Sequence, residues 1–385
     1  MTIELSQHAQ YAQYSQLEKG QIRLLALRQG NNEDEPIECS LSSFNFEDTP
    51  PYEALSYFWG FNRDTRAISI HGTTFQVRAG LYNALRRLRQ PQTTRLLWVD
   101  FICIDQRNQV EIYDQISRLK DVYAKAKSVP IYLGEGAMAT DRAMDYLLQI
   151  EEGGISQITL GTMDDFILEG LLDILSRPYF QSAWLVQDAF YARAMVLHCG
   201  SKAVSSKTII RAVELLSVKI DPLSQNILDL MPGSKSRREG QASSKIQLWD
   251  LLQMFRHAKT TDPRDKIYAV LGMVDFSHSK SVILPDYTMS QEELMQAVIA
   301  NLCFCEPSCV PDLEVKTMDE FLANLDPIDN VILKKILENS MEINLASLLE
   351  YGARYIRIDQ SLIEAASRNK TRGKEMADML LKTIT

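Results

Sequence analysis

The sequence predicts an α/β protein, with a parallel sheet flanked by helices, additional β-strands at the N-terminal side and a mainly helical C-terminal region. Three observations predict this fold class. Apolar runs of strand length alternate with segments of helical spacing between residues 52 and 200, as in βαβ units. Residues 96–104 and 128–134 are almost continuously apolar, which is typical of strands covered on both faces. From about residue 290 the pattern is almost wholly helical.

Strands are predicted where β-type apolar runs are bounded by turn residues. Besides the two buried runs, they cover residues 22–27, 37–46, 52–60, 67–77 and 194–200. The stretch 67–77 is expected to be a hairpin that turns at His71 and Gly72, and 194–200 is expected to be the last strand. Ligands of such a sheet bind beyond the carboxyl ends of its parallel strands.

Helices are predicted where apolar residues recur every three or four positions. They cover residues 80–89, 108–127, 139–151, 163–176 and a segment that resumes after Pro178. In the helix 108–127, Asn108 and Glu111 have the spacing of a helix cap and its reciprocal acid. Glu111 therefore has a structural explanation.

Composition and spacing divide the 385 residues into four parts. Residues 1–20 form a flexible arm, and residues 21–200 form the α/β domain. Residues 201–290 continue it with helices and a polar loop at 232–244. Residues 291–385 form the helical C-terminal region.

Charge and hydropathy exclude several classes of partner. The formal net charge is -9, which repels nucleic acids and anionic membranes, so we predict no nucleic-acid partner. No apolar stretch approaches the ~20 residues that span a bilayer, and the polar N-terminus lacks an apolar signal core. We therefore predict a cytoplasmic protein without a membrane span.

The sequence also lacks the signatures of common enzyme classes. No phosphate-binding G-x-x-x-x-G-K-[ST], zinc-protease H-E-x-x-H or hydrolase G-x-S-x-G motif occurs. Cys303, Cys305 and Cys309 lie close together without the further ligand that a zinc site needs, so no metal site is predicted. Gly134 and Gly136 have dinucleotide-loop spacing, which leaves a dinucleotide-dependent oxidoreductase as one hypothesis, although we predict no tightly bound cofactor.

Two carboxylates stand out. Asp100 lies in or at the end of a buried apolar run, where an ionised carboxylate is costly unless it is paired. It either lines a cleft or is a satisfied acid of the core. Asp188 follows Trp184 by four residues, so the two share one side of a helix. Tyr57 and Trp59 end a strand at the expected cleft edge and either line a pocket or pack in the core.

Three ordered blocks, residues 52–60, 96–134 and 177–200, together resemble the fungal heterokaryon-incompatibility (HET) domain. Residues 261–274 and the Pro-Asp-Tyr at 285–287 are similar to its downstream continuation. The resemblance assigns residues 21–200 to a HET domain. It implies a fungal protein of non-self recognition that triggers regulated cell death. It also implies self-association through this domain and an incompatibility or receptor-type partner protein.

The HET family is in turn similar to Toll/interleukin-1 receptor (TIR) domains. Trp184 and Asp188 match the TIR motif Trp-x-x-x-Glu, whose glutamate cleaves NAD+ in enzymatic TIR domains. The resemblance implies a flavodoxin-like parallel sheet, NAD+ as a substrate and a catalytic role for Asp188. The residues that it implies for the surrounding binding site are Ser56, Tyr57, Trp59, Gly60, Asp100, Trp184 and Gln187.

Residue 188 departs from the family pattern, because the usual residue there is glutamate. Aspartate reaches ~1.5 Å less far, the length of one carbon–carbon bond, and a misplacement of ~1 Å can cost about a hundredfold in rate. Two hypotheses of function follow. The chain is either a weakened NAD+ glycohydrolase or a non-catalytic TIR-like adaptor that acts by self-association.

The end of the chain carries a shorter resemblance. Residues 358–385 are similar to one unit of the helical, ankyrin-like repeats of some fungal multidomain proteins. Since repeats need about three copies to bury a stable core, a single unit indicates a truncated array, a gene-model end or a cap that packs on the helices before it.

Overall fold

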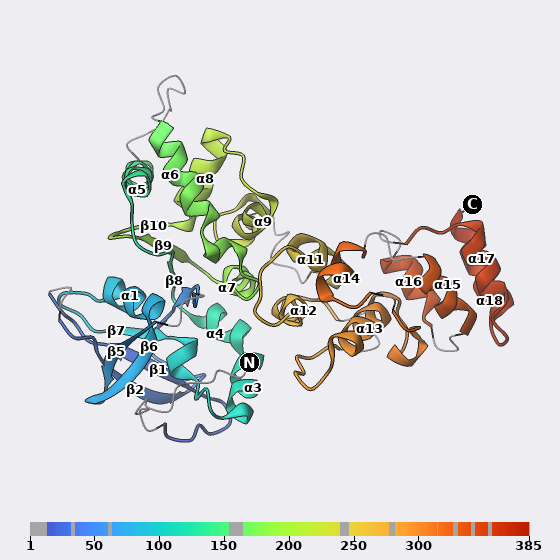
Figure 1. The fold of residues 1–385 in the computed structure, drawn as a ribbon, viewed down its shortest axis with the longest axis horizontal. Helices are drawn as coiled ribbons and strands as arrows, with labels where there is room; N and C mark the ends of the chain where they lie inside the picture. The colour runs from blue at the N-terminus through green and yellow to red at the C-terminus, as the bar shows by residue number, and fades with distance from the viewer. Residues whose placement is uncertain are drawn as a thin grey trace. The chain divides into compact units, whose positions relative to one another are not determined.

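A computed structural model of the chain consists of two compact units, Met1–Ser243 and Ser244–Thr385, both drawn in Figure 1. It describes residues 14–31, 35–60, 64–153, 165–238, 246–276, 282–313, 315–325, 330–339, 343–352 and 356–384. Residues 1–13 of the predicted arm lie outside this description.

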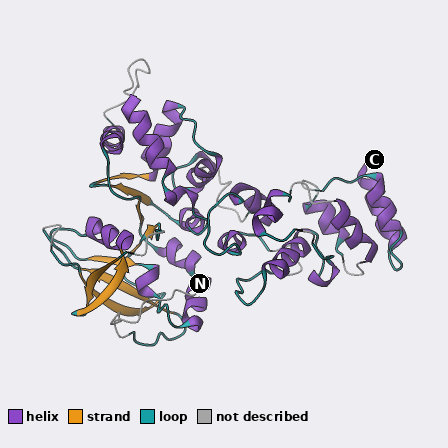
Figure 2. Ribbon diagram, in the orientation of Figure 1, coloured by secondary structure: helices purple, strands orange, loops and turns teal. Residues whose placement is uncertain are grey.

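The N-terminal unit is an α/β domain whose strands form two sheets (Figure 2). One sheet has the order β3-β7-β1-β2-β5-β6 and the other β10-β9-β8-β4. The strands are β1 Gln21–Leu27, β2 Glu38–Asn45, β3 Glu53–Ala54, β4 Ser56–Tyr57, β5 Thr65–Ile70, β6 Thr73–Arg78, β7 Arg95–Trp98, β8 Val129–Tyr132, β9 Met195–Cys199 and β10 Lys202–Ser205.

A parallel core runs through both sheets because β3 and β4 are consecutive. β3 pairs in parallel with β7 and β4 with β8, while β8 pairs in parallel with β9. Across the core the order is therefore β7, β3/β4, β8, β9, which in chain order is 2-1-3-4. This is the beginning of the flavodoxin-like order. The predicted parallel sheet is confirmed, although the single strand predicted at 52–60 divides between two sheets.

The N-terminal β additions are also confirmed. β1 and β2 are antiparallel along their whole length, and β5 and β6 form the predicted hairpin. Its turn residues His71 and Gly72 have φ of 52° and 78°, the positive values that a tight two-residue hairpin of this hand requires.

The helices of the N-terminal unit cover the sheets and fill the connections between parallel strands (Figure 1). They are α1 Ala79–Leu88, α2 Asp100–Cys103, α3 Gln109–Ser117, α4 Leu119–Lys125, α5 Met138–Glu151, α6 Asp165–Ser176, the 3₁₀ helix η1 Pro178–Gln181, α7 Leu185–Tyr191, α8 Ser206–Leu216, α9 Pro222–Leu230 and α10 Lys235–Arg238. α10 lies inside the polar segment predicted as a loop at 232–244.

Three sequence predictions in this unit are wrong in detail. The buried run 96–104 is a strand only as far as Trp98, and α2 follows, because a continuous apolar run does not distinguish a buried strand from a buried helical turn. The helix predicted at 108–127 breaks at Arg118 into α3 and α4. β10 follows the strand predicted as the last, and it pairs with β9 as an antiparallel edge.

The elements that the structure describes in the C-terminal unit are all helices, as predicted. They are α11 Leu248–Phe255, α12 Asp265–Leu271, α13 Gln291–Leu302, the 3₁₀ helix η2 Pro307–Cys309, α14 Met318–Ala323, α15 Asn330–Asn339, α16 Leu345–Tyr351, α17 Gln360–Ser367 and α18 Gly373–Ile384. Among the described residues, no helix is long and apolar enough to cross a bilayer.

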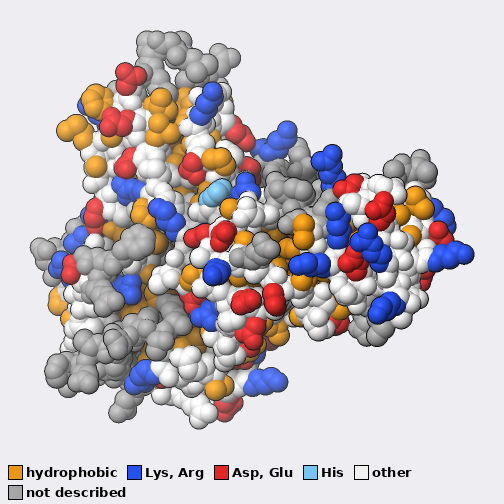
Figure 3. All heavy atoms as spheres, turned by 45° about the vertical axis from the view of Figure 1, so that its right-hand side comes forward, with side chains coloured by type: hydrophobic (Ala, Val, Ile, Leu, Met, Phe, Trp, Pro, Cys, Tyr) orange, Lys and Arg blue, Asp and Glu red, His pale blue; other side chains and the backbone are white. Residues whose placement is uncertain are grey.

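The surface carries charges of both signs. Acidic and basic side chains are interspersed over the face shown in Figure 3. The net charge of the whole chain is -9, and neither sign is confined to one part of this face.

Candidate functional site

The ends of two neighbouring parallel strands and helix α7 bring a set of polar side chains together inside the N-terminal unit. β4 ends at Tyr57, and β7 leads through Val99 into Asp100, the first residue of α2. Asp188 lies on α7, whose residues from Leu185 to Phe190 are all buried. In an α/β fold, the carboxyl ends of parallel strands are the usual place for a ligand site.

Asp188 faces the sheet and not the solvent. The residue is 5% exposed, and its Oδ2 accepts a 2.6 Å hydrogen bond from the hydroxyl of Ser56 on β4. Tyr123 on α4 also lies close to this carboxyl group, and its hydroxyl donates to the carbonyl of Leu55 at 3.5 Å. The Ser56 hydroxyl also lies 3.1 Å from the hydroxyl of Tyr179 in η1. Asp188 is therefore fixed by strand, helix and connection together.

Asp100 occupies the neighbouring position at the end of β7. Its Oδ2 accepts a 2.9 Å hydrogen bond from Nε1 of Trp59, and its Oδ1 accepts one of 2.6 Å from the backbone N–H of Phe101. Tyr57 hydrogen-bonds this carboxyl group as well. The structure thus gives Asp100 the partners that a buried carboxylate needs, and it ties Trp59 to the site.

Burial dominates the electrostatics of both carboxyl groups. It raises the pKa of Asp188 to about 7; the Ser56 hydrogen bond opposes the shift and the charge of Asp100 adds to it. It raises the pKa of Asp100 to about 6, against hydrogen bonds from Phe101, Trp59 and Tyr57. The charge of this pair therefore changes close to neutral pH, a property frequent at functional sites.

Two tyrosines of this cluster were not predicted from the sequence. Burial raises the pKa of both Tyr123 and Tyr179 far above the ordinary value, so both remain neutral hydrogen-bonding groups. Tyr123 also stacks edge-on against Trp98, with ring centroids 5.8 Å apart. A tyrosine in an apolar helical pattern is ordinarily part of the core, and the sequence carries no signal that distinguishes these two.

The remaining predicted residues stand beside the cluster. Gly60 has φ of 78°, and its carbonyl oxygen accepts a 2.9 Å hydrogen bond from Arg78. Trp184 is partly exposed at the N-terminal end of α7, while Gln187 is buried next to Asp188. Of the predicted residues, Ser56, Tyr57 and Trp59 thus hydrogen-bond the two carboxylates.

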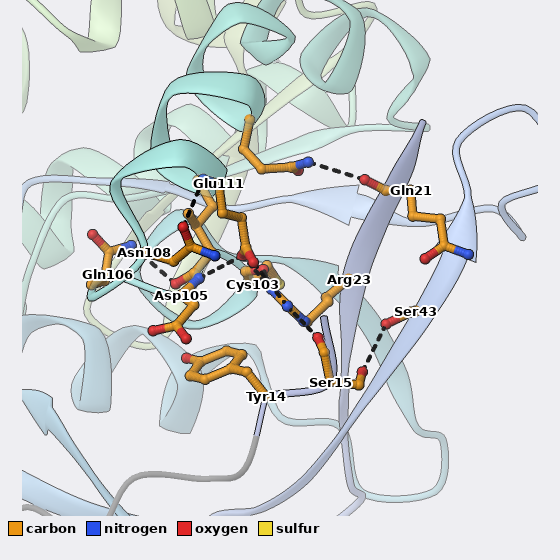
Figure 4. Close-up of polar contacts among 12 residues, drawn as sticks. Tyr14, Ser15, Gln21, Arg23, Ser43, Cys103, Asp105, Gln106, Asn108 and Glu111 are labelled. Atoms are coloured by element: carbon orange, nitrogen blue, oxygen red, sulfur yellow. Dashed lines mark hydrogen bonds and ion pairs between the residues drawn. The ribbon is translucent and has the colours of Figure 1, made fainter. Parts of the chain in front are cut away.

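A buried ion pair of Arg23 and Glu111 lies beside Cys103, the last residue of α2, as Figure 4 shows. Arg23 on β1 donates to both carboxylate oxygens of Glu111, at 2.5 and 3.1 Å, and to the carbonyl of Cys103 at 3.1 Å. The carboxylate of Glu111 also accepts from the backbone of Asp105 at 2.7 Å. Since Cys103 ends α2, Arg23 fixes the helical turn that begins with Asp100.

The N-terminal segment reaches the same turn. The hydroxyl of Tyr14 donates to the carbonyl of Ile102 at 2.9 Å, and the Arg23 guanidinium lies 4.8 Å from the centre of the Tyr14 ring. Asn108 accepts from the backbone of Glu111, so the predicted cap is confirmed. The carboxylate of Glu111, however, binds Arg23 and Asp105 in place of the predicted reciprocal cap.

The glycine-rich stretch after β8 does not have the geometry of a dinucleotide clamp. A Cβ atom built on Gly136 would overlap a carboxylate oxygen of Asp141, and one built on Gly200 would lie 3.0 Å from the backbone of Gly136. A pyrophosphate needs open space and donors at this point, whereas a carboxylate occupies it. This disfavours the oxidoreductase hypothesis.

Comparison with known proteins agrees with the three sequence blocks. The family model of the heterokaryon incompatibility protein (HET) matches residues 52–188. The chain contains a HET domain. The matched residues include the strands β3 to β8 and α7 as far as Asp188. Both carboxylates of the cluster, Asp100 and Asp188, therefore belong to the HET domain.

One relative extends the similarity beyond the HET domain. Heterokaryon incompatibility protein 6, OR allele, of Neurospora crassa is 24% identical over 336 residues, covering 70% of this chain and 49% of that protein. The chain thus spans about half the length of this relative. No solved structure matches the chain.

Proposed function

We propose that the chain acts in heterokaryon incompatibility, the recognition of non-self between fungal cells, and that its HET domain does so by cleaving NAD+ at Asp188. The match of residues 52–188 to the HET family supports the first part. The second part is supported by the proximity of the buried Asp188 to the partly buried Asp100, near the carboxyl ends of β4 and β7.

The chemistry asks little of the protein beyond one placed carboxylate. The bond between nicotinamide and ribose already has a cationic leaving group, so no general acid is needed. A carboxylate beside the ribose stabilises the oxocarbenium-like transition state, as in glycosidases. The indole of Trp59, fixed by Asp100, offers a face for the nicotinamide or adenine ring.

Because Asp188 is 5% exposed, a ribose can reach its carboxylate only if the residues around it move. Trp59 and Trp184 are the partly exposed aromatic residues at the edge of the cluster. Self-association of the HET domain would supply the energy for such an opening. The proposal therefore includes a homo-oligomer as the active form, with an incompatibility partner protein as its trigger.

The length of the side chain at position 188 is expected to limit the rate. We expect Asp188→Glu to cleave NAD+ up to about a hundredfold faster than wild type, since it restores ~1.5 Å of reach, and Asp188→Asn and Asp188→Ala to be inactive. Nicotinamide release from NAD+ by assembled protein measures this. If Asp188→Glu is no faster than Asp188→Ala in folded, assembled protein, Asp188 is not the catalytic carboxylate.

The same proposal predicts a pH dependence. Because the transition state needs a charged carboxylate and burial raises the pKa of Asp188 to about 7, NAD+ cleavage is expected to increase between pH 6 and pH 8. Asp145→Asn is the control variant, because Asp145 is an acid whose side chain is 56% exposed, in a pair with Lys202. Its rate of NAD+ cleavage is expected to change with pH as in wild type. A rate that is flat over this interval in wild type would contradict the assignment.

The burial of Asp188 equally favours a second function, a non-catalytic adaptor in which the carboxylates hold the HET domain in shape for self-association. The described hydrogen bonds of Ser56, Tyr123 and Trp59 would then be structural. Expression of wild type and Asp188→Asn in a fungal host separates the two functions. An incompatibility reaction that persists with Asp188→Asn supports the adaptor, and its loss in a folded variant supports catalysis.

A further inference from the structure

A second cavity, open to solvent, lies in the N-terminal unit, and neither Asp100 nor Asp188 lines it. The cavity has a volume of about 860 Å³. It is lined by α8, by the turn after α9, by α10 and by Arg193, which lies just after α7. Its volume is in the range of small-molecule sites, about 300–1,000 Å³. The lining contains none of the residues predicted for the NAD+ site. The residues are Arg193, Lys207, Ile210, Arg211, Glu214, Leu215, Pro232, Gly233, Arg237 and Arg238.

The charge of this cavity is opposite to that of the chain. Five of its lining residues are Lys or Arg and one is Glu, in a chain of net charge -9. Glu214 lies 3.9 Å from Arg238, and both side chains are more than half exposed, so this pair neutralises little. In the part of the chain that the structure describes, Arg193, Lys207 and Arg211 make no ion pair, and all three are exposed. Such a concentration of cations attracts anions.

Arg237 gives the cavity a fixed wall. Its guanidinium donates to the carbonyls of Ala189, Ala192 and Leu230 at 3.2, 2.8 and 3.3 Å. It therefore joins the C-terminal end of α7 to the end of α9. All three bonds come from Nη1 of Arg237, so the charge of this side chain remains at the cavity. The backbone of Gly233, with φ of 98°, lies close against the stem of Lys207, which places this lysine at the rim.

The lining also has an apolar part. Ile210, Leu215 and Pro232 line the cavity together with the cations. An anion such as chloride or sulfate makes no use of an apolar wall, whereas a phosphate ester with a ring or carbon chain contacts both kinds of surface. Arginine forks match phosphate oxygens in geometry and charge.

We propose that this cavity binds a soluble phosphorylated small molecule with at least two negative charges and an apolar or aromatic part, held by Lys207 and Arg211 on α8 with Arg193 and Arg238. The site is independent of the proposed NAD+ cleavage. Since Arg237 at its wall also holds the end of α7, an occupied cavity borders the helix that carries Asp188.

Calorimetric titration of the full chain with inorganic pyrophosphate and with ADP tests this site. We expect both to bind wild type, ADP more tightly because of the apolar wall. In Lys207→Gln/Arg211→Gln we expect affinity to fall at least about tenfold, since two charged hydrogen-bond donors are removed. The matched variant Arg28→Gln/Lys120→Gln removes two exposed cations elsewhere in the same unit and is expected to bind like wild type.

Three results would overturn the proposal. One is equal loss in the two double variants, which indicates attraction by charge alone. Another is no binding of either probe to wild type at millimolar concentration. The third is tighter binding of duplex DNA than of ADP, which would assign the surface to nucleic acid. If the double variant does not fold, chemical modification of the lysines of the wild-type protein is used instead. Pyrophosphate is then expected to protect Lys207 and not Lys120. Equal modification of Lys207 with and without pyrophosphate would be a fourth result that rejects the site.

Discussion

Replacing Arg23 by methionine is expected to lower the free energy of unfolding by about 3–5 kcal/mol, the usual effect of removing one partner of a buried ion pair. The side chains of Arg23 and Glu111 are 2% and 7% exposed, so the variant leaves a carboxylate without its bidentate partner inside the protein. It also removes the donor to the carbonyl of Cys103. We therefore expect α2, with Asp100 at its start, to lose hydrogen-exchange protection first.

Two further variants separate the ion pair from general effects of charge. Arg23→Met/Glu111→Leu is expected to recover most of the lost stability, because two apolar side chains of similar volume replace a desolvated pair. Arg28→Met breaks the exposed pair with Glu38, whose side chains are 63% and 57% exposed, and is expected to change stability by about 1 kcal/mol or less. Urea unfolding measures all three. A loss in Arg23→Met no larger than in Arg28→Met would contradict the role given to Arg23.

Replacing Asp188 by asparagine is expected to stabilise the protein at pH 8. Burial raises the pKa of Asp188 in the folded state to about 7, whereas an unfolded aspartate titrates near 3.9. The unfolded state thus loses its proton first, so this group's contribution is most favourable below about pH 4 and is lost as the pH rises to about 7. Because each pKa unit corresponds to about 1.4 kcal/mol, the gain in the variant is on the order of a few kcal/mol.

The dependence on pH identifies the source of this gain. The free energies of unfolding of wild type and Asp188→Asn should be nearly equal at pH 4. The difference between them should grow as the pH rises to about 7. Asp100, whose pKa is raised to about 6 by burial, keeps part of the slope in the variant. The exposed control Asp145→Asn should run parallel to wild type over the interval. A difference between wild type and Asp188→Asn that does not change from pH 4 to pH 8 would refute the buried state of this carboxyl group.

The sequence predicted the parallel core because its strands are buried on both faces and lie between amphipathic helices, a pattern that leaves few other folds. It also indicated Asp100, since an acid inside an apolar run needs partners. It left open whether Asp100 lines a cleft or is a satisfied core acid, and the hydrogen bonds from Trp59, Tyr57 and Phe101 supply the partners that a core acid needs.

Other features depend on contacts that one sequence does not contain. Ser56 meets Asp188 across 132 positions of the chain, and Tyr123 and Tyr179 join them from two further elements. The turn of α2 is decided by the tertiary bonds of Arg23 and Tyr14, because its apolar residues fit a strand equally well. The cationic cavity was missed for the same reason, since its lysine and arginine residues lie on three separate segments.

The ionisation of Asp188 inside the closed HET domain is the claim on which the catalytic proposal and the stability argument both depend. Infrared difference spectra between wild type and Asp188→Asn, recorded across pH, report it directly through the C=O stretch of a protonated carboxyl group. We expect a band that is present at pH 5, is lost with a midpoint near pH 7 and is absent from the variant. A midpoint near pH 4, as for an exposed aspartate, would show that burial does not raise the pKa of Asp188.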